Sequence, residues 1–231
     1  MRSLVVGCSG GIGSAIVSLL RSDGHEVIGV SEEAYSAPDL TLHVLADLRR
    51  TDEAQGACQA IRNATSELWA VVYNAGIYNP GVSLYDYPLE LWDEVNNVNL
   101  RSAFIFLQTL SPLIVSGGRI VTIASEAAHL GSRDVAYSAS KSGLLGLTRS
   151  FAIGLADRSI QVNSICPGPI DTPMSSRMSE QHAEEYMKRI RLGRFGQPEE
   201  VAVAVRFLLD PANTYMTGAI LSINGGLYLN I

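Results

Sequence analysis

The sequence contains few of the features that mark disulfide-rich, metal-binding or membrane proteins. Its three cysteines, Cys8, Cys58 and Cys166, form no CxxC pair, which excludes a disulfide framework and the common thiolate metal sites. No apolar run reaches the length of a bilayer span, and the first residues enter a β-rich run directly rather than a signal peptide. We therefore expect reduced thiols in a cytoplasmic protein with no membrane partner.

Positive charge is also scarce. The 17 Lys and Arg residues are outnumbered by 23 Asp and Glu residues, the net charge is -6, and no basic block occurs. Such a chain is not expected to bind nucleic acid or an anionic membrane surface. No cluster of His, Cys and carboxylate residues has ligand spacing, so no metal is expected.

Short β-rich runs alternate with helix-like segments along the whole chain. The predicted strands span residues 3–6, 26–30, 42–45, 69–72, 119–124, 161–165 and 219–223, and several of them are continuously apolar. The segments 14–23, 89–114 and 138–157 have the apolar period of helices. This alternation predicts an α/β fold, a single-domain Rossmann-type doubly wound parallel sheet of about seven strands flanked by helices, over residues 1–231.

One segment breaks the alternation. Residues 172–197 are polar, rich in Met and Arg, and lie between the last two predicted strands. We interpret them as a helical excursion that forms a substrate lid, with an ordinary surface insertion as the alternative.

A glycine-rich turn joins the first strand to the first helix. In "LVVGCSGGIGSAIV", Gly7, Gly11 and Gly13 have the spacing GxxxGxG. Glycine at such a turn allows close backbone approach to a pyrophosphate, whose charge a helix N-terminus favours. The turn therefore predicts dinucleotide binding, although a glycine turn alone can be only a turn.

Three later loops are predicted at the same edge of the sheet. They are "LADLRR", which contains Asp47 and Leu48, "NAG" at 74–76, and "PGPIDT" at 167–172. Ligands bind at the carboxyl ends of parallel strands, so together these loops indicate a cleft.

Four polar residues are candidates for chemistry. Tyr137 and Lys141 are four apart, so they share one face of a predicted helix. Ser125 follows the fifth strand, and Asn99 is a polar residue between Val98 and Leu100 in a predicted helix. Each residue alone has a structural explanation, but all four converge on the predicted cleft.

In this order and spacing, the motifs resemble those of the short-chain dehydrogenase/reductase family, specifically its compact single-domain branch. The resemblance covers residue 3 to the final "SINGGLY" at 222–228. The segments "GRFGQPEEVA" and "YMTGAILSINGG" are similar to 3-oxoacyl-thioester reductases, whereas the enoyl-thioester reductases space their tyrosine and lysine more widely.

The resemblance implies an NAD(P)-dependent interconversion of a secondary alcohol and a ketone by direct hydride transfer. Tyr137 would be the general acid or base, its pKa lowered by Lys141 and the nicotinamide, while Asn99 would hold a water that relays protons from Lys141. The substrate would contact Ser125, Ala127 and Tyr137. The dinucleotide would contact Gly7, Ser9, Gly11, Ile12, Gly13, Ser31, Asp47, Leu48, Asn74, Ala75, Gly76, Tyr137, Lys141, Pro167, Gly168, Ile170 and Thr172.

Two positions depart from the family pattern around the glycine turn. Val6 stands where a threonine is usual, and Tyr73 replaces the first asparagine of "NNAG". We expect an apolar contact to replace the lost polar one and the turn to remain intact.

The end of the second predicted strand bears on cofactor choice. Ser31 is followed by Glu32 and Glu33, and no Lys or Arg is found there or inside the glycine turn. Two carboxylates would repel a 2'-phosphate, so we expect NAD to be preferred over NADP.

Several alternatives remain open at this level. The substrate could be a 3-oxoacyl thioester, a sugar derivative or another small ketone, held by Glu126, Ala127, Tyr78, Tyr85, Pro169 and the 172–197 excursion. A catalytically silent nicotinamide sensor or scaffold, or an isomerase working through a transient ketone, would use the same fold. The resemblance also implies a homotetramer or homodimer.

Overall fold

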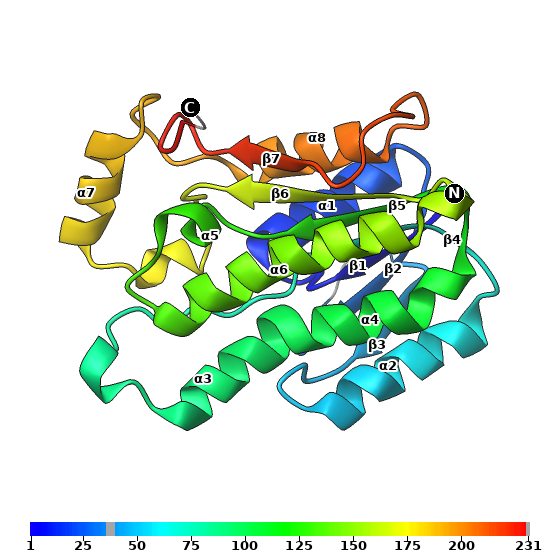
Figure 1. Cartoon of the computed structure of the whole chain (residues 1–231), viewed down its shortest axis with the longest axis horizontal. Coiled ribbons are helices and arrows are strands. Elements are labelled where there is room, and N and C mark those ends of the chain that lie inside the picture. The colour runs from blue at the N-terminus through cyan, green and yellow to red at the C-terminus, as the bar shows by residue number, and fades with distance from the viewer. Residues whose placement is uncertain (36–39, 230–231) are drawn as a thin grey trace.

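The computed structural model describes residues 1–35 and 40–229, and its centre is a parallel β-sheet (Figure 1). Within these residues the sheet has seven strands in the order β3-β2-β1-β4-β5-β6-β7, and every neighbouring pair is parallel. The strands are β1 (Arg2–Val6), β2 (Glu26–Ser31), β3 (Leu42–Leu45), β4 (Leu68–Tyr73), β5 (Ile114–Ile123), β6 (Gln161–Pro167) and β7 (Ile220–Ile223). The predicted fold class is confirmed.

Helices cover both faces of this sheet, as Figure 1 shows. The helices α2 (Thr51–Ala64), α4 (Ser102–Leu110) and α6 (Val135–Gly154) lie on one face, and α1 (Gly11–Ser22) and α8 (Pro198–Leu209) lie on the other. The remaining helices are α3 (Leu89–Asn96), α5 (Ala127–Leu130) and α7 (Glu180–Arg189). Since the central strands are covered on both sides, β4 and β6 read as continuous apolar or buried runs rather than alternating ones.

Two apolar clusters hold the layers together, one on each face. Phe106, Leu144 and Tyr73 belong to the cluster on the α2–α4–α6 face and are fully buried. Ile16 and Val205 belong to the cluster between the sheet and the helices α1 and α8. Each fully buried aliphatic or aromatic side chain contributes about 1.5–3 kcal/mol to folding.

The segment 89–114, predicted as helical, is less regular than its apolar period indicates. It contains α3, a π turn over Asn97–Arg101, α4 and a 3₁₀ turn over Ser111–Leu113. Proline at 112 is compatible with the start of the 3₁₀ turn, and Ile114 already pairs with Leu68 as the first residue of β5. The fifth strand therefore starts five residues before the predicted start at 119.

The strand order reverses beside β1, with β2 on one side and β4 on the other. Such a switch point opens a crevice at the carboxyl ends of the strands. The arrowheads of β6 and β7 in Figure 1 point toward α7, which belongs to the 172–197 excursion. The excursion therefore lies at the edge of the sheet where a ligand is expected, and lid movement remains a prediction.

The helices described in the structure include none with the length and apolar character required to cross a bilayer.

Candidate active site

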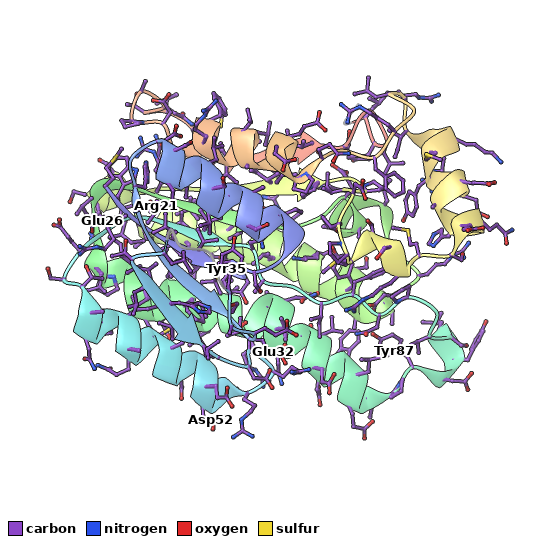
Figure 2. The ribbon with its side chains drawn as sticks, turned by 180° about the vertical axis from the view of Figure 1, so that it is seen from behind. Arg21, Glu26, Glu32, Tyr35, Asp52 and Tyr87 are labelled. Carbon is purple, nitrogen blue, oxygen red and sulfur yellow. The ribbon has the colours of Figure 1, made fainter. Side chains whose placement is uncertain are left out.

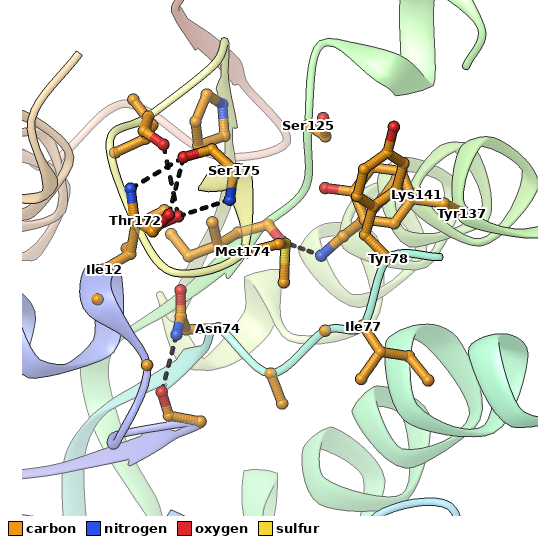
Figure 3. A pocket seen from close by; sticks show the side chains of 18 of the residues that line it. Ile12, Asn74, Ile77, Tyr78, Ser125, Tyr137, Lys141, Thr172, Met174 and Ser175 are labelled. Carbon is orange, nitrogen blue, oxygen red and sulfur yellow. Dashed lines mark hydrogen bonds between the residues drawn. The ribbon is translucent and has the colours of Figure 1, made fainter. Parts of the chain in front are cut away.

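A cavity of about 580 Å³ runs along the carboxyl ends of the strands (Figure 3). All of the predicted catalytic and cofactor-binding residues line it, with the exception of Gly13 and Asn99, which are buried behind its wall. We call the part around Ser125, Tyr137 and Lys141 the Tyr137 end, and the part around Ser31, Glu32, Asp47 and Arg49 the β2–β3 end.

The glycine turn forms one wall of the cavity, and the close packing around Gly7 and Gly13 leaves no space for a side chain at either position. Gly7 has a φ of +82°, and a Cβ on it would lie 2.6 Å from the Ala75 nitrogen. A Cβ on Gly13 would lie 2.0 Å from the Gly7 carbonyl oxygen, so this glycine allows α1 to pack against the turn. Gly10 caps α1 without a side chain, which leaves the first-turn N–H groups available to an anion.

The turn is fixed by the loop after β4. The Asn74 backbone nitrogen donates to the Val6 carbonyl at 2.9 Å, and its side-chain Nδ2 donates to the Gly7 carbonyl at 2.8 Å (Figure 3). Asn74 thus holds the glycine turn through both its backbone and its side chain, in agreement with the expectation that the turn remains intact.

Tyr73, the residue that departs from the family pattern, turns away from the glycine turn. It pairs with Val6 across the β1–β4 register, and both side chains are fully buried in the same apolar cluster. Its hydroxyl donates to the Val98 carbonyl at 2.6 Å and also contacts the Ser102 hydroxyl. The expected apolar replacement agrees with this packing, and the Tyr73 hydroxyl in addition holds the π turn.

Tyr137 lies in the first turn of α6, which begins after Asp134. The Asp134 carboxylate accepts a hydrogen bond from the Tyr137 nitrogen at 3.0 Å and thereby caps the helix. The same carboxylate accepts from the Asn79 nitrogen and the Tyr87 hydroxyl, each at 2.7 Å. One buried side chain thus positions the first turn of α6 against the loop that carries Tyr78.

The Tyr137 ring is packed on one side by Tyr78, whose centroid lies 5.1 Å away in an edge arrangement (Figure 3). Burial raises the pKa of Tyr137 to about 12, while its hydrogen bond with Ser125 acts in the opposite direction. Burial thus opposes the lowering of the Tyr137 pKa that the family resemblance implies, and a phenol whose ordinary pKa is near 10 stays protonated at neutral pH.

Lys141 lies one helical turn after Tyr137, and its ammonium is 5.7 Å from the centroid of the Tyr137 ring. Its side chain is only 3% exposed, and Nζ donates to the Ile123 carbonyl at the end of β5 at 2.8 Å. Burial lowers the pKa of Lys141 to about 8, which means that the charged ammonium destabilises the folded protein. The predicted pairing of Tyr137 and Lys141 on one helix face is confirmed.

Asn99 lies in the π turn and has no exposed surface. Its Oδ1 accepts from the Ile77 nitrogen at 2.8 Å, and its Nδ2 donates to the Ile77 carbonyl at 3.1 Å and to the Ser140 hydroxyl at 3.0 Å. These bonds fix the backbone beside Gly76, where an added Cβ would lie 3.0 Å from Lys141 Nζ. The proposed water relay at Asn99 stays a prediction.

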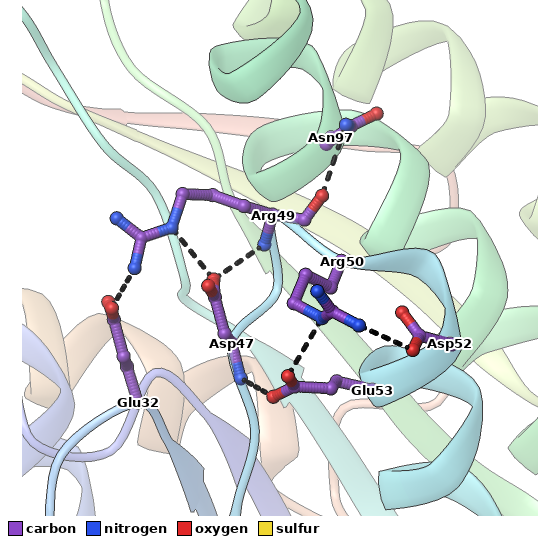
Figure 4. Close-up of polar contacts among 7 residues, drawn as sticks. All are labelled: Glu32, Asp47, Arg49, Arg50, Asp52, Glu53 and Asn97. Atoms are coloured by element: carbon purple, nitrogen blue, oxygen red, sulfur yellow. Dashed lines mark hydrogen bonds and ion pairs between the residues drawn. The ribbon is translucent and has the colours of Figure 1, made fainter.

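The β2–β3 end is dominated by ion pairs (Figure 4). The Ser31 hydroxyl lines the cavity but already donates to the Glu33 carbonyl at 2.8 Å and contacts His43 Nε2 at 2.7 Å. Arg49 Nε donates to Asp47 Oδ1 at 2.8 Å, and Arg49 Nη2 pairs with Glu32. The expectation that no cation lies near this end is wrong, because the loop after β3 brings Arg49 beside Glu32.

The residues predicted to hold the substrate lie only partly along the cavity, and their contact with a substrate stays a prediction. Tyr78, Glu126, Ala127 and Pro169 line the cavity, but Tyr85 does not and is 94% exposed. From the 172–197 excursion, the residues that line the cavity are Thr172, Pro173, Met174, Ser175, Arg177, Met178, Tyr186 and Arg189.

Sequence reasoning missed Asp134 and Arg49. Asp134 could have been found, since an Asp directly before a helix with a following apolar period is a cap signal. Arg49 gave no such signal, because the direction of a loop side chain is not fixed by periodicity.

Comparison with known proteins agrees with this geometry. The family model described as Enoyl-(Acyl carrier protein) reductase matches residues 7–228. The 3-oxoacyl-(acyl-carrier-protein) reductase FabG of Aquifex aeolicus is 38% identical over 240 residues, covering 98% of this chain and 96% of the relative.

Solved structures are similar over nearly the whole chain as well. A short-chain dehydrogenase from Burkholderia cenocepacia in complex with NADP has a TM-score of 0.90 at 31% identity, covering 98% of this chain and 97% of that one. A blue fluorescent protein from a metagenomic library in complex with NADPH has a TM-score of 0.91 at 31% identity, covering 99% and 98%. This chain therefore belongs to the short-chain dehydrogenase/reductase family and is an NAD(P)-dependent oxidoreductase.

Proposed function

We propose that this protein reduces the carbonyl group of a small ketone, with Tyr137 as the proton donor. The observation that carries the proposal is the convergence of Tyr137, Ser125 and Lys141 at one end of the cavity. A group that is protonated at neutral pH suits the reductive direction, in which the substrate oxygen takes up a proton.

In the proposed mechanism, the Ser125 hydroxyl donates a hydrogen bond to the substrate carbonyl and holds it beside Tyr137. The Tyr137 phenol then transfers its proton to the oxygen as negative charge develops there. Lys141 stabilises the phenolate that remains, and Asn99 fixes the loop that packs against Lys141. When bound, a reduced nicotinamide dinucleotide supplies the hydride, and the protein contributes mainly orientation.

The residues present fit such a dinucleotide. The glycine turn offers uncapped N–H groups of α1 to a pyrophosphate, and the cavity continues from there to both ends. In the reverse direction the pKa of Tyr137 would have to fall from about 12 toward neutrality, which requires positive charge from Lys141 and the oxidised nicotinamide together.

We propose a 3-oxoacyl thioester as the first substrate to test. The support is the similarity to relatives named as 3-oxoacyl-(acyl-carrier-protein) reductases, and the mixed wall of Tyr78, Met174, Met178 and Arg177 suits a chain with both apolar and polar parts. Sugar derivatives and other small ketones are the alternative substrates that we propose to test. Reduction of a C=C bond is disfavoured because the Tyr137–Lys141 spacing differs from that of the enoyl reductases in the family.

The test is a spectrophotometric screen that follows loss of the NADH or NADPH absorption band with acetoacetyl-CoA, cyclic ketones and keto-sugars. We expect turnover with at least one carbonyl compound. Tight dinucleotide binding without turnover on any of them would favour the silent sensor and overturn the proposal.

Three finer expectations belong to the same proposal. NAD is preferred over NADP, because Glu32, Glu33 and Asp47 place three carboxylates around the β2–β3 end. The protein is a homotetramer or homodimer, for which the exposed Phe104 on α4 and Ile153 on α6 offer apolar contacts. Its location is the cytoplasm, which agrees with three free, buried cysteines.

A further inference from the structure

Arg49 is held in place at the β2–β3 end by both its backbone and its side chain. Its nitrogen donates to Asp47 Oδ1 at 2.9 Å, and its carbonyl accepts from Asn97 Nδ2 at 3.1 Å. The side chain then spans two carboxylates, with Nε on Asp47 and Nη2 on Glu32 (Figure 4). The cation is therefore fixed at its base, while its tip is occupied by Glu32.

The charges around this tip do not balance. Glu32, Glu33, Asp47 and Arg49 all line the cavity, so one positive charge faces three negative ones. An incoming phosphate monoester, which carries a charge of about -1.5 to -2, is repelled by this group as a whole. A guanidinium whose tip is free is by contrast a strong and often bidentate phosphate ligand.

From these contacts we propose that Arg49 is a latent ligand for the 2'-phosphate of NADP, and that Glu32 blocks it. The inference rests on the proposed binding of a nicotinamide dinucleotide in this cavity. It names one ion pair, Glu32–Arg49, as the determinant of the choice between a free ribose and a phosphorylated one.

The Glu32–Arg49 ion pair can determine ligand preference without determining stability, because both side chains are partly exposed to solvent. The side chains of Glu32 and Arg49 are 56% and 39% exposed, whereas Asp47 is 27% exposed. Exposed pairs contribute little to folding and are screened by salt. Removing the Glu32 charge therefore frees the tip of Arg49 without unfolding the loop, which Asp47 and Asn97 still hold.

Glu33 provides a matched comparison. It also lines the cavity and follows Glu32 directly, but its side chain has no bond to Arg49 in the described part of the chain. Glu33→Gln thus removes the same charge as Glu32→Gln without freeing Arg49.

The experiment measures dissociation constants of NAD⁺, NADP⁺, adenosine 5'-monophosphate and adenosine 2',5'-bisphosphate by calorimetry, which requires no turnover. We expect Glu32→Gln to strengthen binding of the two 2'-phosphorylated ligands about tenfold, with little change for the other two. Adding Arg49→Met should abolish this gain, whereas adding Arg50→Ala should preserve it. Glu33→Gln should give a smaller gain that survives Arg49→Met.

The outcomes separate this inference from the proposed function. If all four ligands fail to bind the unaltered protein, the proposed dinucleotide site itself is wrong, and this inference falls with it. If they bind but the Glu32→Gln gain persists with Arg49→Met, or equals that of Glu33→Gln, the effect is general electrostatics and Arg49 is not the ligand. A preference of the unaltered protein for NADP⁺ over NAD⁺ would also overturn the block by Glu32.

Discussion

The two ends of the cavity differ in how deeply their polar side chains are buried. At the Tyr137 end, Lys141 is 3% exposed and Asn99 is fully buried, and both side chains bond to specific backbone groups. At the β2–β3 end, charged side chains such as Glu32 and Arg49 are between one third and two thirds exposed and pair with each other in solvent. Figure 2 shows Glu32 and Asp52 at this outer edge, close to the start of α2.

The difference shows where single residues have large effects. A buried polar group that loses its partner costs about 1–3 kcal/mol, whereas an exposed ion pair contributes about 0–1 kcal/mol. We therefore expect substitutions at the Tyr137 end to change turnover and stability strongly, and those at the β2–β3 end to change only which ligand is preferred.

Tyr137→Phe is the substitution with the largest expected effect on activity. Loss of the general acid should lower kcat on the order of a thousandfold, while dinucleotide affinity is retained. Steady-state kinetics and calorimetry measure the two quantities. Tyr78→Phe is the matched control, since it removes a neighbouring hydroxyl group and retains the ring that contacts Tyr137. Equal losses in both variants would show that Tyr137 is not the proton donor.

Lys141→Met should lower activity and remove a pH-dependent cost to the stability of the fold, offset at every pH by loss of the hydrogen bond to the Ile123 carbonyl. The lowering of the Lys141 pKa from 10.5 to about 8 corresponds to about 3 kcal/mol of cost for the charged form. Below pH 8 both the folded and the unfolded chain are charged, so the cost is complete. Between pH 8 and 10.5 the unfolded chain binds more protons, and stability rises with pH.

Urea unfolding at pH 7 and at pH 9.5 tests this prediction. Both values lie below pH 10, above which the raised pKa of Tyr137 makes the stability of the fold decrease as the pH rises. The free energy of unfolding of Lys141→Met, measured relative to that of the unaltered protein, should be higher at pH 7 than at pH 9.5. If the difference in free energy of unfolding between the two proteins does not change with pH, burial does not lower the pKa of Lys141.

Asp134→Asn should destabilise the protein by about 1–3 kcal/mol. The Asp134 side chain is 1% exposed and accepts from three donors, and an amide offers only one acceptor oxygen. Thermal unfolding measures the loss, and kcat should fall as well because one donor is the Tyr137 nitrogen. Ser179→Ala, which removes the cap of the exposed helix α7, is the control and should cost about 1 kcal/mol or less.

Tyr73→Phe should cost about 1 kcal/mol, because one buried hydrogen bond to the π turn is lost. Ser102 donates to the same Val98 carbonyl at 2.7 Å. Combining Tyr73→Phe with Ser102→Ala should therefore cost more than the two single changes together. Strict additivity in urea unfolding would show that the two hydroxyls do not share this carbonyl.

Arg50→Ala is the smallest change and completes the comparison. Its guanidinium pairs with Asp52 and Glu53 at the exposed start of α2 (Figure 4). We expect no measurable change in Tm or in dinucleotide affinity. A clear loss of either would contradict the view that ion pairs at this edge contribute little.

The same contrast explains which features the sequence could predict. Glycine spacing and i, i+4 spacing follow from backbone geometry, so the glycine turn and the shared helix face of Tyr137 and Lys141 could be predicted from the sequence. The π turn was not, since the apolar period of 89–114 continues through it. The bond from Tyr73 to Val98 and the direction of Arg49 depend on tertiary contacts between segments far apart in the chain.

The π turn over Asn97–Arg101 also sets the phase of the helical segment that surrounds it. Successive residues of an α-helix are rotated by about 100°, so a turn with one residue more or fewer would rotate α3 about its axis relative to α4. Asn97, which holds Arg49, and Asn99, which holds Ile77, would then face other directions. Loss of a single residue from this turn would disturb both ends of the cavity at once, which no point substitution described above does.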